Sequence, residues 1–204
     1  MVKKSFLRLL TLGSLGTLLA ACSILPEAPH LAVYQLPQGT LQAQNVAAKT
    51  EVLRVAIPYS RNYLNTPRVV AVTPERSLAV MDGIRWEDLG PIVFRDSLIR
   101  ALRSANIYRA VINDDTAAGD YSLRSDLQDF QLDHSVEPAE VVISVDASLS
   151  SLKVRDYPVS TASFKARAPL EAASDEAVLN AFAEANQQIH LQIVQWLSAQ
   201  PSQR

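Results

Sequence analysis

The chain has 204 residues, of which 48% are hydrophobic and 20% are charged. This composition is close to the average of globular domains and excludes a disordered or fibrous chain. The formal net charge is −2, and the first 21 residues carry three basic side chains and no acid, so the remainder is acidic and lacks the basic surface that nucleic acid binding requires.

The first 21 residues have the pattern of an export signal. Lys3 and Lys4 form a basic start, and an apolar stretch then runs from Phe6 to Ala21. Small residues close this stretch, as is typical of secretory signals. A membrane-spanning helix needs about 20 predominantly apolar residues, so the stretch is too short to serve as a permanent anchor. We therefore predict a signal peptide over residues 1–21.

The only cysteine of the sequence, Cys22, follows Leu19-Ala20-Ala21. These four residues resemble the bacterial lipobox. The resemblance implies cleavage between Ala21 and Cys22, a diacylglyceryl group on the Cys22 thiol and an acyl chain such as palmitate on its new amine. One chain binds a membrane marginally, whereas two or more anchor a protein stably. Ser23 follows, and in enteric-type lipoprotein sorting a residue other than aspartate there implies the outer membrane.

Residues 22–49 have the composition of a tether between this anchor and a folded domain. The segment is rich in proline and, towards its end, in glutamine and alanine. Within it, Leu31–Leu36 is apolar enough to form an early strand that docks onto the body and that Pro37 closes. The folded domain is expected over residues 50–200.

Three short strands are expected at the start of this domain. They are centred on Leu53, Val55 and Ile57, on Val69–Val72, and on Leu78 and Val80. The first set alternates with polar or small residues, which indicates one buried face, and the second is a continuous apolar run, which indicates cover on both faces. Asp82-Gly83 then predicts a turn.

A helix is predicted from about Glu87 to Ala105, where the apolar period changes. Pro91 is acceptable in its first turn, and Asn106 is a typical end. The apolar face consists of Phe94, Leu98, Ala101, Leu102 and Ala105.

Four strands and a second helix are predicted after it. The strands cover Ile107–Ile112, Tyr121–Leu132, Val141–Leu149 and Ala162–Pro169. In the second of these the apolar phase slips by one residue, which predicts a bulge near Gln128-Asp129. Ser174 can cap the final helix, whose apolar face is Val178, Phe182, Ala185, Ile189, Ile193 and Trp196. We predict an α+β fold with a mostly antiparallel sheet and two main helices packed on it.

The residue patterns of enzymes and metal sites are missing from the sequence. It contains no G-x-S-x-G, H-E-x-x-H or glycine-rich phosphate motif. We therefore predict no catalytic residue, no metal and no cofactor. His30 and His190 are expected to be solvated. Asp133-His134 leaves an acid-base pair open, although neighbours in a strand point to opposite faces.

Tyr59, Tyr63, Trp86 and Tyr108 flank the ends of predicted strands. Aromatic rings in such places pack into the core with a polar tip more often than they form a contact surface. Trp86 and Tyr63 are nevertheless candidates for a surface that binds a partner.

Several segments together resemble the ABC-type transport auxiliary lipoprotein family over about residues 31–198. The segments, taken in this order and behind a lipobox, indicate the family more specifically than any single segment does. They are Tyr34-Gln35-Leu36, Leu53-Arg54-Val55, Tyr63-Leu64-Asn65-Thr66-Pro67-Arg68-Val69-Val70, Arg85-Trp86-Glu87-Asp88-Leu89, Asp120-Tyr121-Ser122-Leu123 and Val194-Gln195-Trp196-Leu197.

The resemblance implies a lipid-anchored α+β domain with no active site, facing the periplasm from the outer membrane. Such proteins work beside MCE-domain proteins that move lipids between the two membranes, and they support envelope integrity. Its expected partners are the membrane and an MCE-domain protein, and homo-oligomerisation stays open. Two alternatives also stay open: a carrier that holds lipid between the sheet and helices, and a periplasmic hydrolase that uses Asp133-His134.

Overall fold

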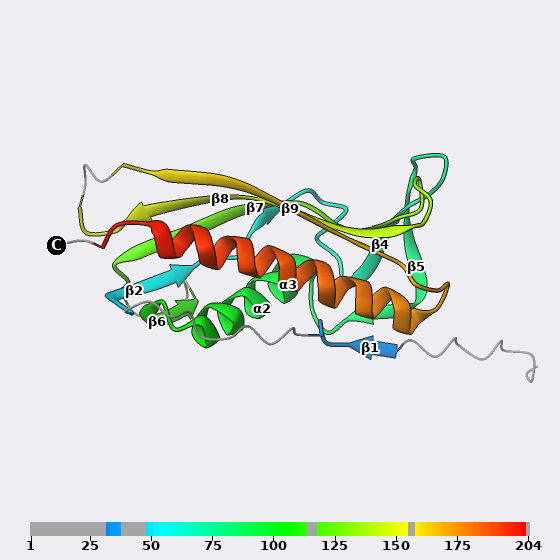
Figure 1. Cartoon of the computed structure of the whole chain (residues 1–204). Coiled ribbons are helices and arrows are strands. Elements are labelled where there is room, and N and C mark those ends of the chain that lie inside the picture. Colours follow the sequence, from blue (N-terminus) through cyan, green and yellow to red (C-terminus); the bar gives the residue numbers. More distant parts are fainter. Residues whose placement is uncertain (1–31, 38–47, 114–117, 155–157, 203–204) are drawn as a thin grey trace, which may run out of the picture. The chain divides into compact units, whose positions relative to one another are not determined.

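The computed structural model describes residues 32–37, 48–113, 118–154 and 158–202. The predicted signal peptide, the cleavage site between Ala21 and Cys22, and His30 lie outside these residues. Within them, the chain forms one nine-stranded sheet and two helices (Figure 1). The strands are β1 (Ala32–Tyr34), β2 (Lys49–Val55), β3 (Tyr59–Ser60), β4 (Arg68–Val72), β5 (Leu78–Trp86), β6 (Tyr108–Asn113), β7 (Tyr121–Asp133), β8 (Glu140–Ser151) and β9 (Ser160–Pro169). The helices are α2 (Gly90–Ala105) and α3 (Asp175–Ala199).

The predicted α+β fold with a mostly antiparallel sheet is confirmed. The long strands β7, β8 and β9 pair antiparallel along most of their length. The other edge of β7 is shared by three short strands, β2, β3 and β4, which pair with it in parallel one after another. Helix α3 packs along β8 and β9, and α2 lies against α3 and β6 (Figure 1).

The predicted bulge in β7 is confirmed at the predicted residues. Leu127 pairs with Val145 and Asp129 pairs with Ser144, so Gln128 is the extra residue. An extra residue reverses which side chains face the core. Phe130, which would otherwise face outward, is therefore buried at 3% exposure.

Two predictions for the early strands are wrong. Asp82-Gly83 is not a turn, because β5 continues through it to Trp86. Gly83 has φ of +82°, a conformation that glycine adopts without steric cost, so it absorbs an irregularity in the strand instead of ending it. Ile57 is 44% exposed and not part of a buried face, because β2 already ends at Val55.

Both predicted helices form, and their ends follow from the residues there. Helix α2 begins at Gly90, three residues later than predicted, with Pro91 in its first turn. It ends where Asn106 takes the left-handed conformation with φ of 53°. Ser174 caps α3, because its hydroxyl oxygen accepts a hydrogen bond from the Ala177 amide at 3.2 Å. Neither helix is both long and apolar enough to span a bilayer.

The prediction that Trp86 contributes to a partner surface is wrong. Its side chain is 1% exposed, because it lies on the same side of β5 as the buried Ile84. The indole packs edge-on against Phe182 at 5.0 Å between ring centroids and lies 5.8 Å from Phe130. Trp86 therefore joins β5, β7 and α3 in one aromatic cluster at the centre of the core.

Asp120 ties together strands that are distant in the sequence. Its carboxylate accepts a hydrogen bond from the Val52 amide at 2.7 Å and forms an ion pair with Lys153, just beyond β8. The bond from Lys153 and then the bond from Val52 lower the pKa of the Asp120 carboxyl group. Asp120 opens one of the segments that carry the family resemblance, and here its role is structural.

We expect Asp120→Ala to lower the free energy of unfolding by about 1–3 kcal/mol, because it leaves the Val52 amide without its acceptor. A lowered carboxyl pKa stabilises the fold above the ordinary aspartate pKa, and this contribution is lost as the pH falls through the folded value. Denaturant unfolding at pH 7 and at acid pH measures the loss of stability and its dependence on pH. Asp126→Ala is the control, because Asp126 is exposed on β7. Equal stability of the two variants at pH 7 would contradict the structural role.

Candidate partner-binding surfaces

The second aromatic candidate, Tyr63, is half-buried and held in place. Its ring packs against the core, and its hydroxyl donates a hydrogen bond to the Gln128 carbonyl at 3.3 Å. Burial, and to a lesser degree Asp129, raises the pKa of the Tyr63 hydroxyl, with Arg61 acting in the opposite direction. Only part of Tyr63 can therefore reach a partner.

The aromatic side chain that does project from this region is Tyr59, which is 74% exposed. It lies on the short strand β3, where it pairs with Asp126 of β7. Tyr59 was one of four aromatic residues that the sequence placed at strand ends. The sequence pattern did not distinguish Tyr59 from Trp86. The exposure of Tyr59 depends on where β2 ends, and the burial of Trp86 depends on the irregularity at Gly83.

Tyr59 borders an open groove of about 420 Å³, which we call the tyrosine groove. The groove lies between the chain that leaves β2 and the start of α2. Apolar side chains form most of it, with two hydroxyl groups (Tyr59 and Ser60) and two amide groups (Asn62 and Asn65). Its lining consists of Ile57, Pro58, Tyr59, Ser60, Asn62, Asn65, Leu89, Pro91 and Ile92. An exposed tyrosine beside apolar side chains is typical of protein interfaces.

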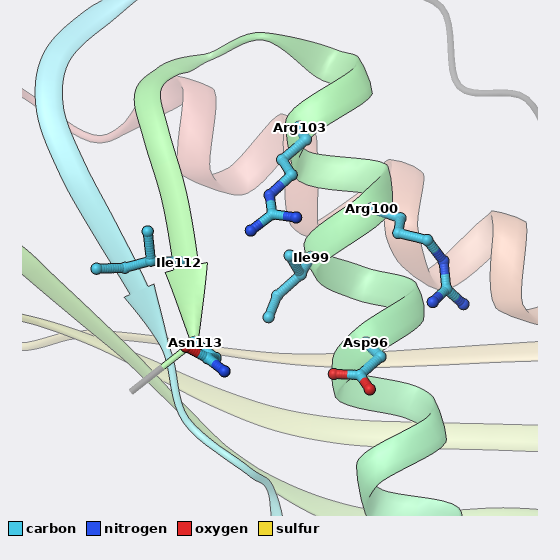
Figure 2. A pocket seen from close by; sticks show the side chains of 6 residues that line it. All are labelled: Asp96, Ile99, Arg100, Arg103, Ile112 and Asn113. Atoms are coloured by element: carbon cyan, nitrogen blue, oxygen red, sulfur yellow. The ribbon is translucent and has the colours of Figure 1, made fainter. Parts of the chain in front are cut away.

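A second open groove of about 490 Å³ lies between α2 and β6, and we call it the arginine groove. Helix α2 contributes one stripe of its surface and β6 contributes its last two residues (Figure 2). The lining residues are Asp96, Ile99, Arg100, Arg103, Ile112 and Asn113. No sequence pattern predicts this groove, because it joins a helix and a strand that only the fold brings together.

Two charged side chains of the arginine groove, Arg103 and Asp96, already have partners. Arg103 extends from α2 toward β6, as Figure 2 shows, and its Nε donates a hydrogen bond to the Val111 carbonyl at 2.9 Å. The Asp96 carboxylate is paired with Nε of Arg95 at 2.8 Å. The one acid of the groove is therefore already neutralised by a neighbour outside it.

His190 is not solvated, contrary to the sequence prediction. It is 4% exposed and lies between α2 and α3. Its Nε2 is 3.2 Å from the Ser97 hydroxyl, which also exchanges hydrogen bonds with Asn186. The sequence pattern placed His190 on a polar face because it assumed one buried side of α3, whereas this helix is covered both by the sheet and by α2.

Burial, with a smaller contribution from the positive charge of Arg100, lowers the pKa of His190 to about 3. The imidazole is therefore neutral at physiological pH. Neither groove described above is lined by His190, Ser97 or Asn186. We interpret the three side chains as a hydrogen-bonded polar contact that fixes how the two helices pack.

The candidate acid-base pair Asp133-His134 lies at the end of β7, where both residues make other contacts. The Asp133 carboxylate accepts hydrogen bonds from both the amide and the hydroxyl of Ser135, at 2.8 and 2.6 Å. His134 is exposed, and its amide donates to the Val72 carbonyl. The carboxylate thus stabilises the turn after β7. Within the described part of the chain, no cluster of three or more histidine, cysteine or acidic side chains could hold a metal ion.

Comparison with known proteins gives one family and several similar structures. The family model described as "ABC-type transport auxiliary lipoprotein component" matches residues 34–194. None of the curated proteins matches the chain.

Among solved structures, that of a protein from Xanthomonas campestris is 22% identical, with a TM-score of 0.72 over 81% of this chain and 94% of that one. The structure of an uncharacterized protein is 18% identical, with a TM-score of 0.66 over 83% of this chain and 99% of that one. A hypothetical protein from Chlamydia trachomatis is 11% identical, with a TM-score of 0.51 over 73% of this chain and 96% of that one. At these identities the similarity is one of fold.

Proposed function

Because the chain belongs to the family of ABC-type transport auxiliary lipoprotein components, we propose that it is a non-catalytic, lipid-anchored component of an MCE-type system that transports lipids between the inner and outer membranes. Cys22 holds it in the outer membrane, and its periplasmic domain docks an MCE-domain protein and so supports envelope integrity. The observation that carries this proposal is the family match over residues 34–194 behind the lipobox at Cys22.

The part of the tether between Cys22 and β1 is short, which fits an anchored domain. Nine residues separate Cys22 from Ala32, the first residue of β1. The ten Cα-to-Cα steps from Cys22 to Ala32 span at most about 33–36 Å. The acyl chains on Cys22 would therefore hold β1 within that distance of the membrane surface.

The described surface and core favour docking over carriage of a lipid. Between the sheet and the helices, the rings of Trp86, Phe94, Phe130 and Phe182 contact one another in one buried cluster. Both grooves are open to the surface, and one of them presents the exposed ring of Tyr59. A domain with these features acts by the proteins that it contacts.

The anchor is tested by Cys22→Ala in cells labelled with a palmitate analogue. We expect the unaltered protein to carry label and to separate with the outer membrane, because two or more acyl chains anchor a protein stably. The variant is expected to carry no label and, once its signal is cleaved, to leave the membrane fraction. Ser23→Asp is the matched control, which should keep the label but move the protein to the inner membrane.

N-terminal mass analysis distinguishes a cleaved variant from an uncleaved precursor. A cleaved, unlabelled Cys22→Ala protein that stays bound to the membrane would show that another part of the chain holds it there.

A further inference from the structure

Two groups of exposed apolar side chains lie at opposite ends of the sheet. One group, which we call the hairpin end, consists of Leu78, Val80 and Val136. Leu78 is 53% exposed, and the two valines are each 40% exposed. The other group lies between β8 and β9 and consists of Leu152, Val154 and Val159. Such a group is a candidate contact surface, and its place in the molecule decides what it can contact.

The β4–β5 hairpin holds two of these side chains in fixed positions. Leu78 pairs with Val72 in the antiparallel hairpin, and Val80 follows two residues later on the same face of β5. The turn between the strands is closed by a hydrogen bond from the Thr73 amide to the Ser77 carbonyl at 2.9 Å. The two apolar side chains are therefore exposed on a regular strand and not on an irregular loop.

Val136 lies at the same end of the sheet, because β7 ends beside the hairpin. Strands β4 and β7 are parallel, and Val72 pairs with Asp133, the last residue of β7. The His134 amide then donates a hydrogen bond to the Val72 carbonyl at 2.9 Å. Figure 1 shows the β4–β5 hairpin and the turn between β7 and β8 together at the right of the sheet.

The chain enters β1 from the direction of the hairpin end. Strand β1 is parallel to β5, and Ala32 pairs with Ile84, so both strands begin toward the end that carries Leu78. Six residues of β5 separate Leu78 from Ile84, which is at most about 20 Å of strand. The ten Cα-to-Cα steps from Cys22 to Ala32 span up to about 33–36 Å. A membrane that holds Cys22 is therefore within reach of the hairpin end.

The composition of the hairpin end suits an uncharged lipid surface. Residues 73–80 and 134–139 contain one arginine, two glutamates and one histidine. Recognition of anionic lipids uses clusters of about four or more lysines and arginines, which these residues lack. Leucine and valine side chains gain free energy when they leave water. Their contact area is small, but a short tether raises the effective concentration of the membrane, so a weak contact is sufficient.

We propose that Leu78, Val80 and Val136 rest on the membrane that holds Cys22 and insert between zwitterionic phospholipids. This second contact orients the domain, with its hairpin end on the bilayer and the Leu152 end directed away from it. The inference rests on the proposed function for the acylation of Cys22. The choice of the hairpin end follows from the direction in which the chain enters β1.

The sequence allows one fluorescent label per molecule. Cys22 is the only cysteine, and acylation blocks its thiol in the mature lipoprotein. The variants Leu78→Cys, Val136→Cys and Val159→Cys therefore each carry one free thiol, which is labelled with nitrobenzoxadiazole. The full-length lipoprotein is inserted through its acyl chains into vesicles of phosphatidylcholine and phosphatidylethanolamine. Part of the phosphatidylcholine carries a nitroxide quencher on an acyl chain.

We expect the label in Leu78→Cys and in Val136→Cys to shift its emission to the blue and to be quenched by the nitroxide lipid. Val159→Cys is the matched control, because Val159 is exposed at the opposite end of the sheet, and its label should stay unquenched. High salt should leave the quenching unchanged, since the contact is apolar. Equal quenching in Leu78→Cys and Val159→Cys, or no quenching in Leu78→Cys and Val136→Cys, would overturn the proposal.

A charge at the hairpin end should weaken the contact. Leu78→Asp, introduced into the labelled Val136→Cys protein, places a carboxylate where an apolar side chain enters the lipid, so the quenching should decrease. Leu152→Asp in the same protein is the control and should leave the quenching unchanged, because Leu152 is exposed in the other group. Equal quenching in these two proteins would contradict a role for Leu78 in the contact.

Other occupants of the hairpin end give different results. If a second copy of this chain covers it, the label in Leu78→Cys should shift to the blue at high protein-to-lipid ratio without quenching by the lipid. If the contact is electrostatic, quenching should require phosphatidylglycerol and disappear at high salt. Either result would replace the proposed lipid contact.

The unaltered protein separates this inference from the proposed function. If Cys22 is not acylated, the unaltered protein should react with the thiol label and should not insert into the vesicles, which would contradict the proposed function. If it stays unlabelled and inserts, but the label in Leu78→Cys and Val136→Cys is not quenched, only the membrane contact of the hairpin end is contradicted.

Discussion

Replacing Trp86 with alanine is expected to lower the free energy of unfolding by about 3–5 kcal/mol, the range found when a large buried aromatic side chain is truncated. The indole is 1% exposed and contacts Phe130 and Phe182 at once. Its removal leaves a cavity where β5, β7 and α3 meet. Trp86→Phe keeps an aromatic ring and should cost less, so it shows the effect even if the alanine variant does not fold.

Tyr59→Ala is the matched comparison for this experiment. Tyr59 is 74% exposed, so its truncation should change the free energy of unfolding by less than about 0.5 kcal/mol. Its effect should instead appear as weaker docking to the partner. Urea unfolding of the three variants measures the difference. A Trp86→Ala protein as stable as the unaltered one would contradict the place of this side chain in the core.

The second large effect is a loss of stability at mildly acid pH because of His190. Its folded pKa is lowered to about 3 by burial, whereas an unfolded histidine titrates near 6.5. Between these values the unfolded state binds a proton that the folded state does not. The contribution of His190 to the free energy of unfolding is therefore fully present above about pH 6.5. It falls with decreasing pH, by about 2 kcal/mol between pH 7 and pH 5.

His190→Gln should remove this pH dependence, since glutamine stays uncharged and can still hydrogen-bond with Ser97. His134→Gln is the control, because His134 is exposed and its replacement should leave the pH dependence unchanged. Denaturant unfolding at pH 7, 6 and 5 provides the measurement. A similar decline in His190→Gln and in the unaltered protein would assign the effect to other groups.

The elements that the sequence predicted best are those with a clear local pattern. The alternation through Val141–Leu149 and the helical period of α3 depend only on neighbouring residues, and both elements form. Even the bulge at Gln128 was predictable, because the apolar phase changes there. The parallel pairing of β2, β3 and β4 along one edge of β7 has no local signal, since it joins residues far apart in the sequence.

The errors arose where tertiary packing decides the role of a residue. Asp82-Gly83 has the composition of a turn, but pairing with β4 carries the strand past it. Trp86 and Tyr59 both flank strand ends, yet one is in the core and the other is exposed. His190 is buried because α3 has a second covered side. The two grooves were not predictable, because each joins segments whose proximity only the fold creates.

We propose that this domain works by docking an MCE-domain protein. A photoactivatable amino acid at Tyr59, in the full-length lipoprotein in living cells, tests it most directly. Its position beside the tyrosine groove places the reactive group on an exposed surface without disturbing the core. We predict a light-dependent adduct in which mass spectrometry identifies an MCE-domain protein. Adducts with unrelated proteins only, from cells that contain an MCE system, would contradict the claim.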